Sequence, residues 1–252
     1  MRFASLGSGS KGNATLIHKG NTCVLLDCGF SLKETEHRLK RLDLKASQIC
    51  AIVVTHEHGD HIRGVGPLAR KYEIPVFLTR GTAACKTLGK LPKVHHIDVH
   101  DAFSIDELYL QPYPVPHDAK EPCQFVFSDG IRKLGILTDT GSITTHIEEQ
   151  LNGCHALLLE CNHDSEMLAE GSYPLSLKQR VGGRFGHLSN DQAAGLLKRL
   201  DTSNLNLLIA AHISEQNNTP QYAKEALWSG LGFEPDWIDI LDQDEGFDWC
   251  EI

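Results

Sequence analysis

The segment of residues 53–64, with the sequence VVTHEHGDHIRG, constrains this chain more than any other. An apolar run, residues 49–55, reads as a strand buried on both faces and leads directly into three histidines, a glutamate and an aspartate within six positions. Without a metal, such a cluster would crowd like-charged or desolvated groups together for no gain. The pattern H-x-H-x-D-H therefore favours metal ligation over the alternative, a solvated surface loop.

The spacing within this motif suggests how ions would be held. Imidazoles two positions apart in an extended segment point the same way, so His56 and His58 can bind one ion. Asp60 and His61 come one turn later and can reach a second ion nearby. The zinc-protease motif H-E-x-x-H is absent, because the position four after His56 is Asp60.

Three further candidate ligands stand at the ends of other apolar runs. His117 follows an apolar run that ends in two prolines, Pro114 and Pro116. Asp139 ends the run LGILTD, and His212 ends the run LLIAAH. Each alone is weak evidence, since a lone histidine is more often a satisfied core residue. Together with the first motif they supply five histidines and two aspartates. That set is sufficient for two ions, with Asp139 as a bridge.

The rest of the chain predicts sheets covered by helices, with functional groups at strand ends. A Gly20-Asn21 turn predicts a hairpin, and capping residues mark two helix starts, at Ser31 and at Thr219 with Pro220. The predicted strand regions are 1–7, 13–29, 49–55, 101–115, 124–139, 155–161 and 205–212, and the predicted helices are 31–42, 189–200 and 219–231. We expect residues 1–252 to form a single domain.

Composition limits the classes of protein. The chain is 41% hydrophobic and 23% charged, which is ordinary for a soluble protein. No apolar run approaches the roughly 20 residues that span a bilayer, and the N-terminal segment does not resemble a secretory signal. The eight cysteines contain no C-x-x-C pair and read as buried thiols of a reducing compartment. We therefore expect a cytoplasmic protein with no membrane partner.

The formal net charge of −9 argues against a generic basic nucleic-acid coat. It does not exclude a nucleic-acid enzyme, because divalent cations in a cleft can dominate the local field. Lys178, Arg180 and Arg184 are the one local basic cluster. They could meet a phosphate backbone or form a solvated face.

A glycine motif near the N-terminus resembles a dinucleotide-binding fingerprint. Gly7, Gly9 and Gly12 satisfy G-x-G-x-x-G, with Asp27 further on. The intervening segment alternates as strands rather than forming a helix, which argues against that fold. The glycines instead predict a tight loop whose N–H groups and hydroxyls face a site.

His187 is the candidate for phosphate chemistry. It precedes a helix start at which Ser189 and Gln192 have capping-box spacing, so exposed N–H groups and the helix dipole favour an anion there. His187 would contact phosphate or donate a proton to the leaving oxygen, although it could also merely cap the turn. Glu160 ends another strand and could orient a catalytic imidazole; a purely structural role is nearly as well supported.

These motifs together resemble the metallo-β-lactamase fold hydrolases, in the branch of phosphodiesterases and nucleases that includes ribonuclease Z. The segments GSGSKGN, LLDCG, THEHGDH, TDTG, ECNHD, YPLSLKQRVGGRFGHLSN and AHISEQNN resemble the YycJ/WalJ-type subfamily over essentially the whole chain. The resemblance implies an α/β fold, the αβ/βα four-layer sandwich, with the site at one edge. It also implies a site built from many residues. The first ion would be held by His56, His58 and His117, and the second by Asp60, His61 and His212, with Asp139 bridging. Asp60, His187 and Glu160 would be catalytic, and Ser8, Ser10, Asn13, His163, Ser189 and Asn217 would contact substrate.

The leading hypothesis is a dinuclear phosphodiesterase that hydrolyses nucleic acid, with DNA and a 5′-to-3′ exonuclease direction implied only by the resemblance. Zn²⁺ or Mn²⁺ would be the cofactor, with Fe²⁺ as a third option. One alternative keeps the metals and takes a small cyclic phosphodiester or a thioester. Another is a non-catalytic regulatory protein on the same fold, although the full set of seven ligand candidates counts against it. The sequence does not indicate an oligomeric state.

Overall fold

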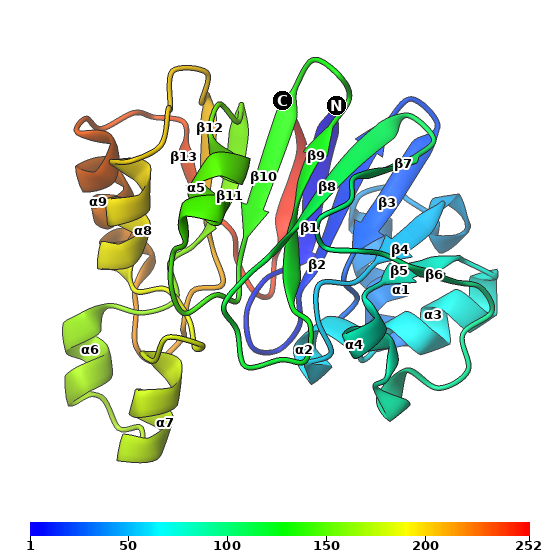
Figure 1. Ribbon diagram of the computed structural model, residues 1–252, viewed down its shortest axis with the longest axis horizontal. Coiled ribbons are helices and arrows are strands. Elements are labelled where there is room, and N and C mark those ends of the chain that lie inside the picture. Colours follow the sequence, from blue (N-terminus) through cyan, green and yellow to red (C-terminus); the bar gives the residue numbers. More distant parts are fainter.

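The computed structural model describes all 252 residues and contains two seven-stranded sheets packed face to face, with helices on both outer faces (Figure 1). The first sheet has the order β14-β1-β2-β3-β4-β5-β6 and the second the order β13-β12-β11-β10-β9-β8-β7. The first comprises β1 (Arg2–Gly7), β2 (Ala14–Lys19), β3 (Thr22–Leu26), β4 (Ala51–Val53), β5 (Val76–Leu78), β6 (Val94–His96) and β14 (Phe247–Glu251). The second comprises β7 (Phe103–Ile105), β8 (Leu108–Pro114), β9 (Cys123–Ser128), β10 (Lys133–Leu137), β11 (Ala156–Glu160), β12 (Leu207–Ala211) and β13 (Ile238–Ile240).

Three apolar cores separate the four layers. One lies between the first sheet and the helices α1 and α3, one between the two sheets, and one between the second sheet and the helices α5, α8 and α9. The helices are α1 (Leu32–Arg41), α2 (Gly59–Ile62), α3 (Val65–Tyr72), α4 (Arg80–Ala83), α5 (Thr145–Leu151), α6 (Ser165–Glu170), α7 (Leu175–Val181), α8 (Asn190–Leu197) and α9 (Pro220–Leu231). The short 3₁₀ turns are Ala46–Gln48 and Lys86–Leu88. This arrangement confirms the predicted αβ/βα sandwich.

The continuous apolar runs are explained by burial on both faces of each sheet. Along β3, Val24 contributes to the core between the sheets, and Cys23 and Leu25 to the core under the helices. Successive side chains of a strand point to opposite faces. A strand covered on both sides therefore needs apolar residues at every position, which is the pattern that predicted the strands.

Strand direction brings polar residues to one edge of the sandwich. β3 to β6 run parallel to one another, and so do β10 to β13. The residues that follow β3, β10 and β12 are Asp27, Asp139 and His212, and all three have positive φ, at 59°, 53° and 53°. Aspartate and histidine are among the few side chains that enter this left-handed region. The turn at each strand end thus directs a polar group to the same edge.

Most predicted elements are confirmed, and some were missed. Ser31 caps α1, Thr219 caps α9 with Pro220 in its first turn, and a reciprocal capping box joins Ser189 and Gln192 at the start of α8. The prediction assigned no element between residues 56 and 100, where the structure has α2, α3, β5, α4 and β6, and it also missed α5, α6, α7, β13 and β14. None of the helices is long and apolar enough to cross a membrane.

Candidate metal centre

Three imidazoles converge at the edge of the sandwich, two from the loop after β4 and one from the loop after β8. His58 Nδ1 lies 3.0 Å from His56 Nε2 and 3.2 Å from His117 Nε2. The ligand atoms of all three residues lie within 4.8 Å of one another. Three imidazole nitrogens that face a common point are suited to a single metal ion.

In two of these rings, His56 and His117, the Nδ1 atom, which faces away from the other histidines, forms a hydrogen bond with a neighbouring residue. His117 Nδ1 lies 3.1 Å from the carbonyl oxygen of Gly186, which can only accept, so the proton is on Nδ1. His56 Nδ1 lies 3.0 Å from Thr55 Oγ1, and that hydroxyl donates to Asp27 Oδ2 at 2.8 Å. The Thr55 oxygen therefore accepts from His56. In both rings the proton sits on Nδ1, which leaves the Nε2 lone pair free for a ligand.

A second group of ligand candidates surrounds Asp139. Asp139 Oδ2 lies 3.3 Å from His61 Nε2 and 3.2 Å from His212 Nδ1. Asp60 Oδ2 lies 3.6 Å from His61 Nε2, and its side chain is 25% exposed, whereas those of Asp139 and His61 are almost fully buried. Asp139 thus lies between two candidate ligands of the second group, His61 and His212. His56, His61 and Asp139 also form one compact set of donor atoms, so the two groups are contiguous.

The chemistry of these donors fits divalent cations. Burial by itself would raise the pKa of Asp139, but the adjacent His212 and His61 hold it well below its usual value. Burial lowers the pKa of His117 and brings that of His56 well below the usual value, which favours neutral imidazoles. Neutral imidazoles and an ionised carboxylate are the forms in which these side chains ligate metals. Burial lowers the pKa of His61 and His212, but the Asp139 carboxylate outweighs it and raises both, so these two rings must release a proton to bind an ion.

Beside these groups stands a carboxylate–imidazole pair. Glu160, at the end of β11, is fully buried, and its Oε1 lies 2.8 Å from His187 Nδ1. Its Oε2 accepts from the N–H groups of Thr140 and Leu188 at 3.1 and 3.2 Å. Burial lowers the pKa of His187, but the charge and hydrogen bond of Glu160 outweigh that effect and raise the pKa to about 9. His187 is therefore protonated near neutral pH, with its Nδ1 held in place.

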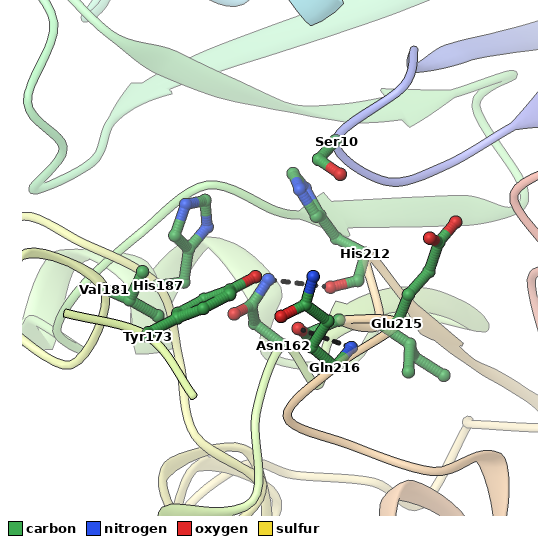
Figure 2. A pocket seen from close by; sticks show the side chains of 10 residues that line it. Ser10, Asn162, Tyr173, Val181, His187, His212, Glu215 and Gln216 are labelled. Atoms are coloured by element: carbon green, nitrogen blue, oxygen red, sulfur yellow. Dashed lines mark hydrogen bonds between the residues drawn. The ribbon is translucent and has the colours of Figure 1, made fainter. Parts of the chain in front are cut away.

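A pocket of about 160 Å³ opens next to this pair. His187 and His212 line it together with Ser10, Asn162 and Tyr173. Figure 2 shows the Tyr173 side chain below that of His187, with its hydroxyl directed toward Asn162. Asn162 donates to the carbonyl of His212 at 3.0 Å, so it also fixes the loop that presents this candidate ligand.

The six residues predicted to contact substrate are placed differently from one another. Ser10 lines the pocket. Ser8 and Asn13 are buried behind the candidate ligands: Ser8 Oγ accepts from the N–H of His212 at 3.2 Å, and Asn13 Nδ2 lies 3.1 Å from His61 Nε2. The other three are also buried and are not among the pocket's lining residues: His163, Ser189 and Asn217.

Comparison with known proteins places the chain in a family. Residues 22–213 match the family described as "Beta-lactamase superfamily domain". The chain is 36% identical to "Exodeoxyribonuclease YycJ" of Bacillus anthracis over 228 residues, which are 89% of this chain and 86% of that protein. The chain belongs to the beta-lactamase superfamily.

Two further comparisons extend this result. "Exodeoxyribonuclease WalJ" of Streptococcus pneumoniae is 32% identical over 88% of this chain and 85% of that protein. The crystal structure of the metallo-beta-lactamase fold protein YhfI from Bacillus subtilis matches with a TM-score of 0.78 at 15% identity, covering 100% of this chain and 99% of that one. At that identity the structural match shows the shared superfamily fold alone.

The sequence prediction missed two carboxylates, those of Asp27 and Asp118, that lie beside the candidate metal ligands. Asp27 was considered only as part of a dinucleotide motif, yet its Oδ2 lies 2.8 Å from His61 Nδ1. Asp118, the residue after His117, has its Oδ1 3.7 Å from His58 Nε2. A signal existed for Asp27, because it follows an apolar run as Asp139 does. Asp118 carried no signal beyond its position next to His117.

Proposed function

We propose that this chain is a dinuclear metal-dependent exodeoxyribonuclease that hydrolyses DNA from the 5′ end. The observation that carries the proposal is the His187–Glu160 pair, in which the buried carboxylate lies 2.8 Å from His187 Nδ1 and holds the ring 3.7 Å from the candidate ligand Asp139. The names of the YycJ and WalJ relatives support DNA as the substrate. The 5′-to-3′ direction rests on the subfamily resemblance.

The ligand assignment keeps the two predicted sets. His56, His58 and His117 would hold one ion, and Asp60, His61 and His212 the other, with Asp139 shared. When bound, divalent cations at these residues supply a Lewis acid that polarises the phosphodiester and lowers the pKa of water. Nitrogen and oxygen donors suit Zn²⁺ and Mn²⁺ alike. The free state of all eight cysteines accords with a reducing cytoplasm as the place of action.

The chain's own groups would then orient the substrate and move protons. Glu160 fixes His187 Nδ1, so the remaining Nε2–H is free to donate to the leaving oxygen as the P–O bond breaks. Asp60, the more exposed of the two candidate carboxylate ligands, would reach the attacking water. The pocket lined by Ser10, Asn162 and Tyr173 would receive the nucleotide on the His187 side.

The test is cleavage of 5′- and 3′-end-labelled DNA, single-stranded and duplex, by purified protein with Mn²⁺ or Zn²⁺. We expect metal-dependent shortening from the 5′ end. His187→Gln should lower kcat by about 100-fold or more, the scale of a general acid, while the metal content stays near that of wild type. Asp139→Asn should lower both metal content and activity.

Each result bears on a different part of the proposal. Shortening from the 3′ end would overturn the direction alone. Failure of a fully metallated protein to cleave any DNA would overturn the nuclease and favour a small phosphodiester or thioester as substrate. Full activity in His187→Gln would remove this residue from the chemistry.

A further inference from the structure

The segment between α6 and His187 exposes apolar side chains that the fold does not use. α7 has no buried residue, and with α6 it extends beyond the ends of α8 and α9 (Figure 1). Leu175 is 70% exposed and Phe185 is 58% exposed. A helix of a globular domain normally buries one face against the core. A helix whose side chains are at most partly buried, followed by an exposed aromatic ring, indicates a surface for a partner.

Phe185 is fixed directly to the first group of candidate metal ligands. Its carbonyl oxygen accepts from the N–H of Asp118 at 3.0 Å, and the next carbonyl, that of Gly186, accepts from His117 Nδ1 at 3.1 Å. One residue further along is His187. The backbone of Phe185 therefore lies at the rim of the metal centre, between a candidate ligand and the candidate proton donor.

The loop that carries Phe185 is tightly packed. The N–H of Gly186 donates to Gly183 at 2.9 Å, and that of His187 donates to Val181 at 2.8 Å. A Cβ atom added at Gly186 would lie 2.2 Å from the carbonyl oxygens of Arg180 and Val181. Such a loop presents its exposed side chain in a fixed place, which lowers the entropy lost when a ligand binds.

Two arginines beside Phe185 identify the chemistry of the partner. Arg180 Nε donates to Asp118 Oδ2 at 2.7 Å, the side chain is 62% exposed, and its two Nη groups make no hydrogen bond within the protein. Arg184 is exposed and forms no ion pair. Guanidinium N–H groups bind phosphate oxygens, and those on the two Nη atoms of Arg180 stay open although its Nε is paired with Asp118. In a chain with a net charge of −9, their position at this rim favours a polyanion over an apolar peptide.

We propose that Phe185 and Arg180 bind the substrate strand beside the scissile phosphate, with the Phe185 ring stacked on an unpaired base and the Arg180 guanidinium on a flanking phosphate. This inference rests on the proposed nuclease function and names the part of the substrate recognised. A base that has left the duplex exposes both of its faces, which favours stacking of an aromatic ring on it. The preferred substrate is therefore a single strand or a frayed end.

The test measures binding of the metal-loaded protein to a fluorescent single-stranded oligonucleotide with phosphorothioate linkages, which resist hydrolysis. Phe185→Ala should weaken binding by about tenfold, the scale of one base stacked on an aromatic ring, and Phe185→Trp should restore it. Arg180→Ala should reduce the slope of log affinity against log salt by about 0.7, as expected for one phosphate contact on a single strand. Phe233→Ala, which removes a ring that is 54% exposed on another surface, is the matched control.

A set of oligonucleotides, each with one abasic position, identifies the stacked base. At one position, loss of the base should weaken binding to wild type while leaving binding to Phe185→Ala unchanged. The inference is overturned, and the nuclease retained, if wild type cleaves DNA while Phe185→Ala and Arg180→Ala bind it with wild-type affinity and salt slope. A wild-type protein that neither cleaves nor binds DNA would overturn both.

Discussion

A single buried carboxylate, that of Asp27, orients two of the candidate ligands. Asp27 accepts from the N–H and hydroxyl of Thr55 at 2.9 and 2.8 Å and lies 2.8 Å from His61 Nδ1. Through the Thr55 hydroxyl it also fixes the proton of His56. Partners of this kind set the ring orientation and the tautomer of a ligating histidine. Asp27 therefore fixes the orientation of two candidate ligands, His61 directly and His56 through Thr55.

We expect Asp27→Asn to lower affinity for the bound metal by about 10- to 100-fold. The amide keeps the size of the side chain and tolerates the left-handed backbone at this position, where φ is 59°. It removes the negative charge that faces His61. Metal content after dialysis against a graded chelator measures the effect. Asp43→Asn is the matched control, because Asp43 has φ of 52° on an exposed turn. Equal metal retention in both variants would contradict the assigned role.

At the scale of elements, the sequence predicted the long apolar strands and the polar residues at their ends. The runs ending at Asp139 and His212 were recognisable because strands covered on both faces are apolar throughout and their ends carry polar residues. The three-residue strands β5 and β6 are too short to show a periodicity. α7 has no buried face, so no amphipathic pattern marks it. The capping interactions were predictable because they depend on residues three apart.

The loop after β10 packs against the loop that carries Phe185, and a glycine makes this approach possible. A Cβ at Gly141 would lie 2.4 Å from the carbonyl oxygen of Gly183 and from the amide nitrogen of Gly186. We expect Gly141→Ala to destabilise the fold by about 1–3 kcal/mol and to lower kcat, because displacement of Gly186 frees His117 Nδ1.

Urea unfolding and the labelled-DNA assay measure these two effects of Gly141→Ala. Gly59→Ala is the control at the same edge, since its added Cβ meets nothing within 4 Å. Wild-type stability in Gly141→Ala would show that the two loops can separate without cost, and the packing argument would fail.

At the scale of the whole molecule, the candidate centre joins the two sheets. His56, His58 and His61 follow β4 of the first sheet, whereas His117, Asp139 and His212 follow β8, β10 and β12 of the second. Both chain termini lie at the other end of the sandwich (Figure 1). Bound cations would therefore add to the central core, and to hydrogen bonds such as that between the N–H of His212 and Ser8 Oγ, in holding the two sheets together.

Removal of metal should accordingly lower the thermal stability of the whole chain. A cation present at about a thousand times its dissociation constant contributes about 4 kcal/mol to the folded state. In a domain of this size that corresponds to a drop in Tm of about 10 °C on chelation. Circular dichroism melts before and after chelation, and after Zn²⁺ or Mn²⁺ is restored, measure the change. Asp139→Asn should show a smaller metal-dependent gain, because the shared ligand is weakened while Asn accepts the same φ of 53°. An unchanged Tm in protein shown to release its metal would mean that the core alone fixes the two sheets and that the site is preformed without its ions.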